Sequence, residues 1–111
     1  GTLLNDAMEA KAIRRLLGHL PCSSTKPTIG HCLGAAGAME IGFCWLALQQ
    51  GRNGVYPLLP HAWDGERDAT LPELQLVCRG DMLEQRGPVY FMSNSFAFGG
   101  NNCAVIIGRL V

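Results

Sequence analysis

The sequence lacks any excess of charge of one sign. Its nine basic and nine acidic residues cancel, and charged residues make up only 16% of its 111 residues. A neutral balance provides no attraction for nucleic acid, an anionic membrane surface or a strongly charged substrate. We therefore expect partners that are recognised by shape, with no nucleic acid among them.

Paired cysteine motifs are also missing. The five cysteines have no repeated short spacing and no C-x-x-C pair. We interpret them as reduced and mostly buried, in a cytoplasmic protein. A zinc site is the alternative, and its ligands would be Cys22, Cys32, His19 and His31. That set lacks the paired spacing that is typical of zinc ligands.

No processing signal is visible, and no uninterrupted apolar run is long enough to span a membrane. Nothing resembles a basic region followed by a cleavage site, so we expect no secretory signal. Residues 33 to about 50 are nearly all small or apolar, but Glu40 and three glycines interrupt them. The stretch is also shorter than the ~20 residues that a bilayer requires, so we predict a buried core helix and no membrane span. The chain begins at Gly1 without a methionine, and we expect it to be part of a longer protein.

Capping patterns and apolar periodicity predict two helices. Asp6-Ala7-Met8-Glu9 is a capping-box pattern, and apolar residues then recur at helical spacing, which predicts an amphipathic helix over residues 6 to 18. The second helix covers residues 33 to about 50, and Gly51 is placed to end it. A helix that is apolar on every side should be buried on every side. Its three glycines should allow neighbouring backbone to approach closely.

Short β-prone runs complete the pattern. Residues 21 to 28 carry two prolines and four hydroxyls, which favours an extended loop. Strands are predicted near residues 55–56, at 74–78, at 89–92 and at 104–107. The last two flank a glycine loop and are continuous apolar runs, so each should be buried on both faces. The sequence therefore predicts an α/β fold in which helices cover a mostly buried mixed sheet.

His31 lies directly before the predicted core helix. The unsatisfied N–H groups and the dipole at a helix start disfavour a charged imidazolium, so a neutral ring can donate one N–H. Such a donor can stabilise an enolate or a thioester oxyanion. A histidine satisfied by loop carbonyls is the structural alternative, and the residues alone leave both open.

Two further features allow both a functional and a structural interpretation. Lys26 and Glu9 can form an ion pair that fixes the loop, although two solvated charges are the simpler interpretation. Gly99-Gly100 after Phe96-Ala97-Phe98 can aim main-chain N–H groups at one spot as an oxyanion hole, or can form a turn between two strands. No Lys or Ser/Thr follows in the register of a phosphate-binding loop.

Three ordered motifs resemble the C-terminal part of the β-ketoacyl-[acyl-carrier-protein] synthases, condensing enzymes of the thiolase fold. Gly1-Thr2 followed by Asp6 and Glu9 resembles the end of the motif His-Gly-Thr-x-Thr-(x)3-Asp-(x)2-Glu. Residues 25–31 resemble Thr-Lys-(x)3-Gly-His, and residues 93–100 are similar to the loop Asn-Ser-Phe-Gly-Phe-Gly-Gly. The resemblance implies one domain over residues 1–111, truncated at its N-terminal side, that forms the C-terminal half of a thiolase-like fold.

The resemblance implies roles for three charged or titratable residues. His31 would be the second catalytic histidine, which donates to the thioester carbonyl and helps to decarboxylate the malonyl group. Lys26 and Glu9 would form the ion pair that orders the site.

The resemblance assigns further residues to substrate and ion binding. Thr2 would bind the phosphopantetheine arm of acyl carrier protein, Phe98 would supply a backbone N–H to the oxyanion hole, and Phe96 would gate the acyl pocket. A monovalent cation is expected at Glu40, Ser93 and Asn94. No other cofactor is implied, because the phosphopantetheine of the carrier protein holds the substrates.

The resemblance also implies an activity that this chain cannot perform alone. The nucleophilic cysteine belongs to the N-terminal half, and the first histidine would stand three residues before Gly1. The whole protein would be an acyltransferase, active as a homodimer or heterodimer, that condenses malonyl-acyl carrier protein with an acyl-enzyme thioester in fatty-acid, polyene or polyketide synthesis. The alternative is a non-catalytic partner subunit of the chain-length-factor kind. Ala97 replaces a glycine of the family pattern, and Asn101 replaces a threonine. Residues 96–102 together with His61-Ala62-Trp63-Asp64-Gly65 resemble the enzymes of aryl-polyene clusters.

Overall fold

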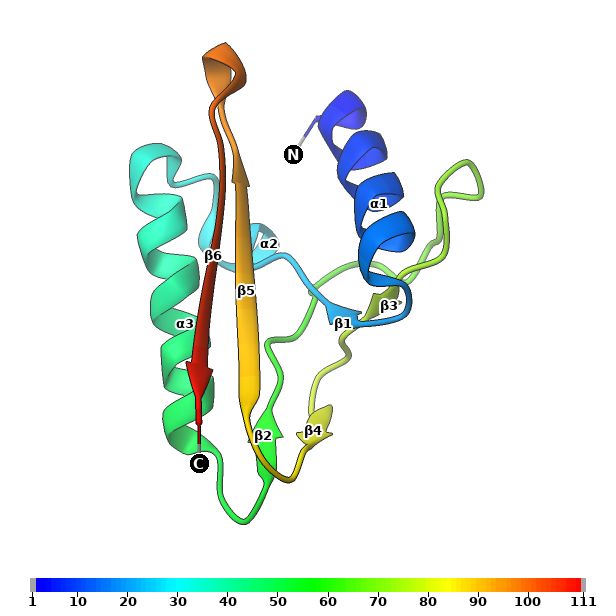
Figure 1. Ribbon diagram of the computed structural model, residues 1–111. Helices are drawn as coiled ribbons and strands as arrows, with labels where there is room; N and C mark the ends of the chain where they lie inside the picture. The colour runs from blue at the N-terminus through cyan, green and yellow to red at the C-terminus, as the bar shows by residue number, and fades with distance from the viewer. Residues whose placement is uncertain (1, 111) are drawn as a thin grey trace. The chain divides into compact units, whose positions relative to one another are not determined.

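The computed structural model describes residues 2–110, which form two compact units (Figure 1). Unit 1 comprises Gly1–His31 and Pro60–Arg79, and unit 2 comprises Cys32–Leu59 and Gly80–Val111. The helices are α1 (Leu3–Leu17), α2 (Lys26–Ile29) and α3 (Ala36–Gln50), with 3-10 turns at Leu33–Ala35 and Phe98–Gly100. The strands are β1 (Pro21–Cys22), β2 (Val55–Pro57), β3 (Gln75–Leu76), β4 (Met82–Glu84), β5 (Val89–Phe96) and β6 (Asn102–Arg109). The predicted α/β class is confirmed.

Helix α1 begins three residues before its predicted start. Thr2 is the N-cap, and its Oγ1 accepts the backbone N–H of Asn5 at 3.2 Å. The capping box predicted at Asp6 and Glu9 is therefore wrong, because a threonine hydroxyl already satisfies the early N–H groups. Glu9 instead accepts a hydrogen bond from Asn5 Nδ2 at 3.3 Å, one turn along the helix. The helix ends at Gly18, whose φ of +69° is open to glycine at no steric cost.

Regular structure interrupts the predicted loop over residues 21–28. Strand β1 pairs in parallel with β3, and the ladder continues as the N–H of Val77 donates to the carbonyl of Cys22 at 3.0 Å. Pro27 lies in the first turn of α2, where a proline removes no intrahelical hydrogen bond. The loop prediction is wrong for these residues because a strand partner from residues 75–77 is not visible in the local sequence.

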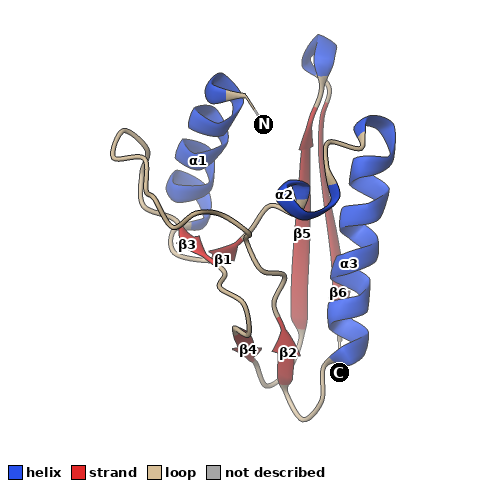
Figure 2. Ribbon diagram, turned by 180° about the vertical axis from the view of Figure 1, so that it is seen from behind, coloured by secondary structure: helices blue, strands red, loops and turns tan. Residues whose placement is uncertain are grey.

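Unit 2 is built on one helix and one hairpin. Helix α3 runs alongside β5 and β6 in both views (Figures 1 and 2), and these two strands pair antiparallel from Val89↔Arg109 to Phe96↔Asn102. The buried core consists of Leu48, Tyr56 and Val89. Leu83, Phe91 and Ile107 pack against it. The predicted strands at 89–92 and 104–107 are confirmed, and each is longer than predicted.

Burial in unit 2 is one-sided. Helix α3 buries Cys44, Ala47 and Leu48, whereas Trp45 is 54% exposed and Leu46 is 45% exposed. The prediction that this helix is buried on every side is therefore wrong for the described chain. None of the helices within residues 2–110 is long and apolar enough to cross a membrane.

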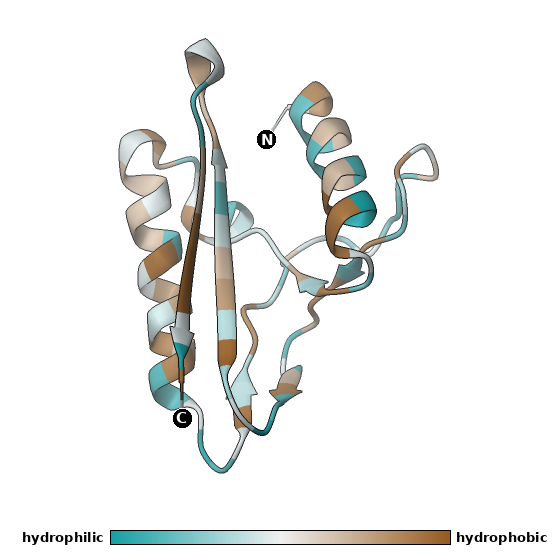
Figure 3. Ribbon diagram, viewed as in Figure 1, coloured by the Kyte–Doolittle hydropathy of each residue, from teal (hydrophilic) through white to brown (hydrophobic). Residues whose placement is uncertain are grey.

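The hairpin shows the same one-sided burial. Strand β6 has a half-buried residue only at Ile107, so the expectation that it is buried on both faces is wrong. Apolar colour is continuous along most of β6 and is interrupted by pale and teal bands on β5 (Figure 3), and α3 packs against only one face of the two strands. The described strands form three separate two-stranded sheets, one parallel and two antiparallel.

Side chains pack closely against one glycine within α3 and against the glycine that follows it. A Cβ on Gly37 would lie 3.3 Å from Ser95 Oγ, whereas Gly34 and Gly42 have no such neighbour within 4 Å. The predicted close approach of neighbouring backbone is therefore wrong for these three glycines, because the one close neighbour, at Gly37, is a side chain. Gly51 ends the helix as predicted, but with φ of −57°, and glycine is needed there because a Cβ would overlap the ring of Tyr56.

Candidate functional site

His31 follows a one-turn helix that ends in a glycine. The N–H of Gly30 donates to the carbonyl of Lys26 at 2.8 Å, and Gly30 has φ of +84°. Helix α2 ends there, and the side chain of the next residue, His31, is exposed. Two residues further along, Leu33 has φ of +47°, a left-handed conformation that costs a side chain about 1–2 kcal/mol. Backbone strain of this kind concentrates at functional sites.

Glu9 and Lys26 interact electrostatically. Glu9 is half-buried on α1, and burial raises the pKa of its carboxyl, while the positive charge of Lys26 and the hydrogen bond from Asn5 act to lower it. The net direction is upward, so burial outweighs the cation. The structure thus brings together two residues that lie 17 positions apart and that the sequence left as either a pair or two solvated charges.

A histidine that the sequence analysis did not single out for the site holds the loop before Lys26. His61 is half-buried, and its Nδ1 accepts the backbone N–H of Ser24 at 3.0 Å. Burial lowers the pKa of its imidazole. The sequence includes His61 in the segment that resembles aryl-polyene enzymes, but it does not predict this contact, because the partner is a backbone group 37 residues away.

Thr2 caps helix α1, in addition to its predicted role in binding the phosphopantetheine arm. Its hydroxyl oxygen accepts the N–H of Asn5 as the cap of α1. A hydroxyl carries one proton to donate and two lone pairs, so this bond leaves the proton of Thr2 for a second acceptor. Capping is therefore compatible with the predicted contact of Thr2 with the phosphopantetheine arm.

Two of the three predicted cation ligands lie together. Ser93 Oγ donates to Glu40 Oε2 at 3.0 Å, between β5 and α3. Successive residues of a strand point to opposite faces, so the side chain of Asn94 lies on the face of β5 away from Glu40. Glu40 and Ser93 offer the oxygen ligands that hard cations prefer, without the amide of Asn94.

The second metal site considered from sequence is not formed. Within residues 2–110, no three side chains of the His, Cys, Asp and Glu type are grouped as metal ligands. The zinc set of Cys22, Cys32, His19 and His31 is therefore absent from the described chain.

The glycine loop is a tight turn that joins β5 to β6. Gly99 and Gly100 have φ of +75° and +77°, and the N–H of Ala97 donates to the carbonyl of Asn101 at 2.8 Å. Asn101 Nδ2 also donates to the carbonyl of Phe98 at 3.0 Å. A side-chain amide at position 101, where the family pattern has threonine, therefore braces the turn. Phe98 is 91% exposed at its tip.

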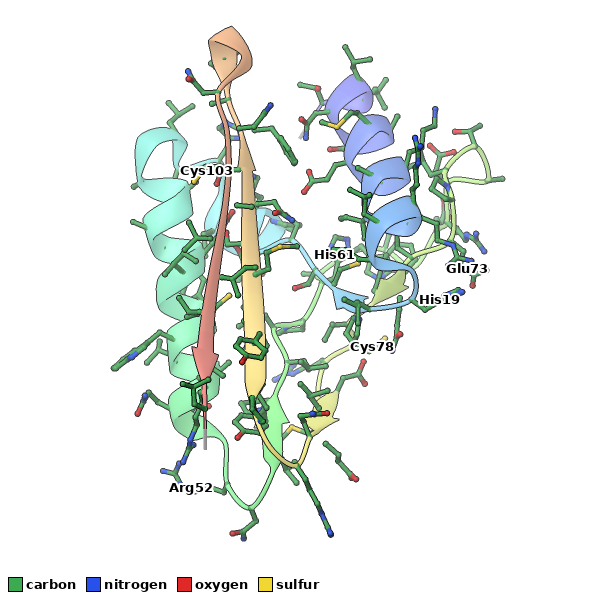
Figure 4. The ribbon with its side chains drawn as sticks, viewed as in Figure 1. His19, Arg52, His61, Glu73, Cys78 and Cys103 are labelled. Carbon is green, nitrogen blue, oxygen red and sulfur yellow. The ribbon has the colours of Figure 1, made fainter. Side chains whose placement is uncertain are left out.

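Two of the five cysteines are poor nucleophiles because they are shielded from water. All five are free thiols. Burial raises the pKa of Cys22 and of Cys44, which keeps both thiols protonated and unreactive. Cys78 and Cys103 are exposed (Figure 4), so the prediction that the cysteines are mostly buried is wrong for these two.

Comparisons with known proteins converge on one family. A family model described as the C-terminal domain of beta-ketoacyl synthase matches residues 1–57. Nodulation protein E of Rhizobium meliloti is 38% identical over 109 residues, which are 95% of this chain and 25% of that protein. The mitochondrial 3-oxoacyl-[acyl-carrier-protein] synthase of Arabidopsis thaliana is 35% identical over 115 residues, 98% of this chain and 23% of that enzyme.

A bacterial synthase is similar to the chain to about the same degree. 3-oxoacyl-[acyl-carrier-protein] synthase 2 of Staphylococcus aureus (strain COL) is 35% identical over 112 residues, 97% of this chain and 25% of that enzyme. The chain thus spans about a quarter of the length of the curated relatives that it matches. No solved structure matches the chain.

Proposed function

Because the chain belongs to the β-ketoacyl synthase family, we propose that it is the C-terminal part of a decarboxylating condensing enzyme. The whole protein extends an acyl thioester by two carbons taken from malonyl-acyl carrier protein. The α/β fold is the one expected of the C-terminal half of a thiolase-like enzyme. Acyl carrier protein is the partner that presents both substrates on its phosphopantetheine arm, and a homodimer or heterodimer is the expected assembly.

The interaction between Glu9 and Lys26 is the observation that carries this proposal. The half-buried carboxyl of Glu9 on α1 interacts electrostatically with Lys26, the first residue of α2. His31 lies just after the other end of α2. A buried charge is costly, and it is retained where chemistry needs an ordered polar site. Burial raises the pKa of the Glu9 carboxyl and Lys26 lowers it, so Glu9 is not a fully solvated charge.

His31 acts in the decarboxylation step. Its ring N–H donates to the carbonyl oxygen of the malonyl thioester, the bond to the carboxylate breaks, and carbon dioxide leaves. The electron pair moves into an enolate, whose oxygen bears the new charge that the imidazole stabilises. This assignment uses the exposure of His31 and its position directly after Gly30.

The second half of the reaction forms the carbon–carbon bond. The enolate carbon attacks the acyl thioester on a cysteine outside this chain, and the backbone N–H of Phe98 donates to the resulting oxyanion. Collapse of that intermediate expels the cysteine thiolate. Phe96, which is 38% exposed at the end of β5, gates the acyl pocket, and Thr2 binds the phosphopantetheine arm. Glu40 and Ser93, joined by a hydrogen bond at 3.0 Å, would hold the monovalent cation through their oxygen atoms.

Separate measurement of the two half-reactions tests the proposal. In the whole synthase, His31→Ala should lower malonyl decarboxylation by about 10²–10³-fold, the cost of removing an oxyanion donor. Acylation of the nucleophilic cysteine, followed by intact-protein mass spectrometry, should be largely unchanged. His19→Ala is the matched control, since His19 is an exposed histidine of the same unit.

Two results would contradict the proposal. Unimpaired decarboxylation by His31→Ala would remove His31 from the chemistry. The absence of any acyl adduct on the whole wild-type protein would identify it as the non-catalytic partner subunit of a heterodimer.

A further inference from the structure

His61 connects two segments of unit 1 through both its backbone and its ring. Its backbone N–H donates to the carbonyl of Val77 at 2.8 Å, directly after β3. Its Nδ1 accepts the backbone N–H of Ser24 at 3.0 Å, two residues after the end of β1. Figure 4 labels this histidine. The imidazole therefore extends the pairing of β1 with β3 beyond the point where the two strands separate.

The bonds around His61 form a continuous series that ends at Lys26. The N–H of Val77 donates to the carbonyl of Cys22 at 3.0 Å, so β3 and β1 are joined at one end of the series. At the other end, the N–H of Lys26 donates to Ser24 Oγ at 3.4 Å. Ser24 is thus held from one side by His61 and itself supports the first residue of α2.

The acceptor role defines the state of the ring. A nitrogen that accepts an N–H carries no proton, so Nδ1 is unprotonated and the proton of a neutral imidazole is on Nε2. Trp63 lies against the imidazole with ring centroids 6.0 Å apart and planes inclined at 59°, a tilted aromatic contact that restrains the ring. An aligned acceptor is needed here because the N–H of Ser24 is otherwise without a strand partner.

We propose that His61 is a positioning residue for Lys26: its Nδ1 fixes the backbone of Ser24 and thereby the placement of the Lys26 ammonium against Glu9. This inference rests on the proposed function, in which Lys26 orders the site. It adds a residue outside the three family motifs and assigns the segment 60–79 a part in the chemistry.

Variants that separate the acceptor from the bulk of the side chain test the proposal in the whole synthase. His61→Leu removes the acceptor at similar volume, and His61→Asn places an amide oxygen close to the position of Nδ1. We expect His61→Leu to lower kcat for condensation by about 10–10²-fold, the cost of misplacing a catalytic group, and His61→Asn to restore most of it. His19→Leu is the matched control, because His19 is exposed.

Amide hydrogen exchange gives a readout that does not depend on activity. Exchange in the peptide that contains Ser24 should become faster in His61→Leu and stay near the wild-type rate in His61→Asn. Unchanged exchange in His61→Leu would overturn the proposal, as would equal loss of kcat in both variants, because packing alone would then explain His61. These results are distinct from a failure of the proposed function, which His31→Ala tests separately.

Discussion

The two units of the chain are held by different forces. In unit 2 the buried residues include Leu48, Tyr56 and Val89, which form one cluster. In unit 1, among the described residues, only Ala10 and Val77 are buried. Unit 1 depends instead on hydrogen bonds between segments distant in sequence, and it carries the residues proposed for the decarboxylation chemistry. Packing supports the scaffold, and polar contacts place the reacting groups.

Charged side chains also serve different ends in the two units. In unit 2, Arg109 Nη1 donates to the carbonyls of Leu48 and Gly51 at 3.3 and 3.2 Å, and Arg52 Nη1 donates to the carbonyl of Gln49. These cations satisfy the last carbonyls of α3, as a helix C-terminus favours. In unit 1, the half-buried Glu9 has a raised pKa, so its environment favours the neutral form. That environment disfavours the charge that the proposed pair requires.

Truncation of the core of unit 2 should have the largest effect. Leu48→Ala removes a side chain that is 4% exposed and should lower the free energy of unfolding by about 2–5 kcal/mol. Equilibrium urea unfolding of the chain measures the loss. Leu46→Ala, on the same helix but 45% exposed, is the matched control and should cost much less. Equal losses from the two variants would show that packing does not distinguish the faces of α3.

Neutralisation of Glu9 should separate activity from stability in unit 1. Glu9→Gln keeps an acceptor for Asn5 but removes the charge that faces Lys26, so condensation by the whole synthase should fall by about 10²-fold. The raised pKa means that the fold favours the neutral carboxyl, and thermal unfolding at pH 7 should show no loss of Tm.

Glu73 provides the control for Glu9. It is exposed and pairs with Arg67 at 3.2 Å on the surface of the same unit, so Glu73→Gln should change neither activity nor Tm. A clear drop in Tm for Glu9→Gln would mean that the ion pair with Lys26 stabilises the fold more than burial opposes it.

The sequence predicted unit 2 better than unit 1 because the signals of unit 2 are local. Two apolar runs around Gly99-Gly100 were enough to place β5 and β6, and a run ended by Gly51 was enough to place α3. The predicted burial of these elements was wrong, because the residue pattern of a strand or helix does not show which of its faces another element covers. In unit 1, β1 exists only because β3, more than 50 residues away, pairs with it.

The residues of the candidate site also differ in whether the local sequence could predict them. Motif spacing identified Lys26 and His31, which occupy the two ends of one short segment. It could not identify His61, whose partner is the main chain of Ser24 and leaves no mark on residue type. Asn94 stays a prediction as the third cation ligand, and its side chain lies on the face of β5 opposite to that of Ser93, because adjacent residues of a strand face opposite ways.

Acidification should act on unit 1 through His61. Burial lowers the pKa of this imidazole in the folded state, so below about pH 6.5 the unfolded chain binds more protons than the folded chain. The free energy of unfolding therefore falls as the pH drops from about 6.5 towards the lowered folded-state pKa, and this contribution is constant above that range. Urea unfolding of wild type and His61→Asn across this range measures the effect. A wild-type slope that persists in the variant would assign it to other groups.

Relief of backbone strain should have the smallest effect, and it bears on the junction after His31. Leu33 has φ of +47° and is 69% exposed, so glycine there removes a left-handed penalty of about 1–2 kcal/mol and little buried surface. The extra freedom of glycine in the unfolded chain returns about 0.5–1 kcal/mol of this gain. Leu33→Gly should therefore raise the free energy of unfolding by roughly 0.5–1 kcal/mol. Leu20→Gly, in an exposed position of unit 1 without a left-handed φ, has only the entropic cost and should lower it, so a loss at both positions would show that Leu33 is not strained.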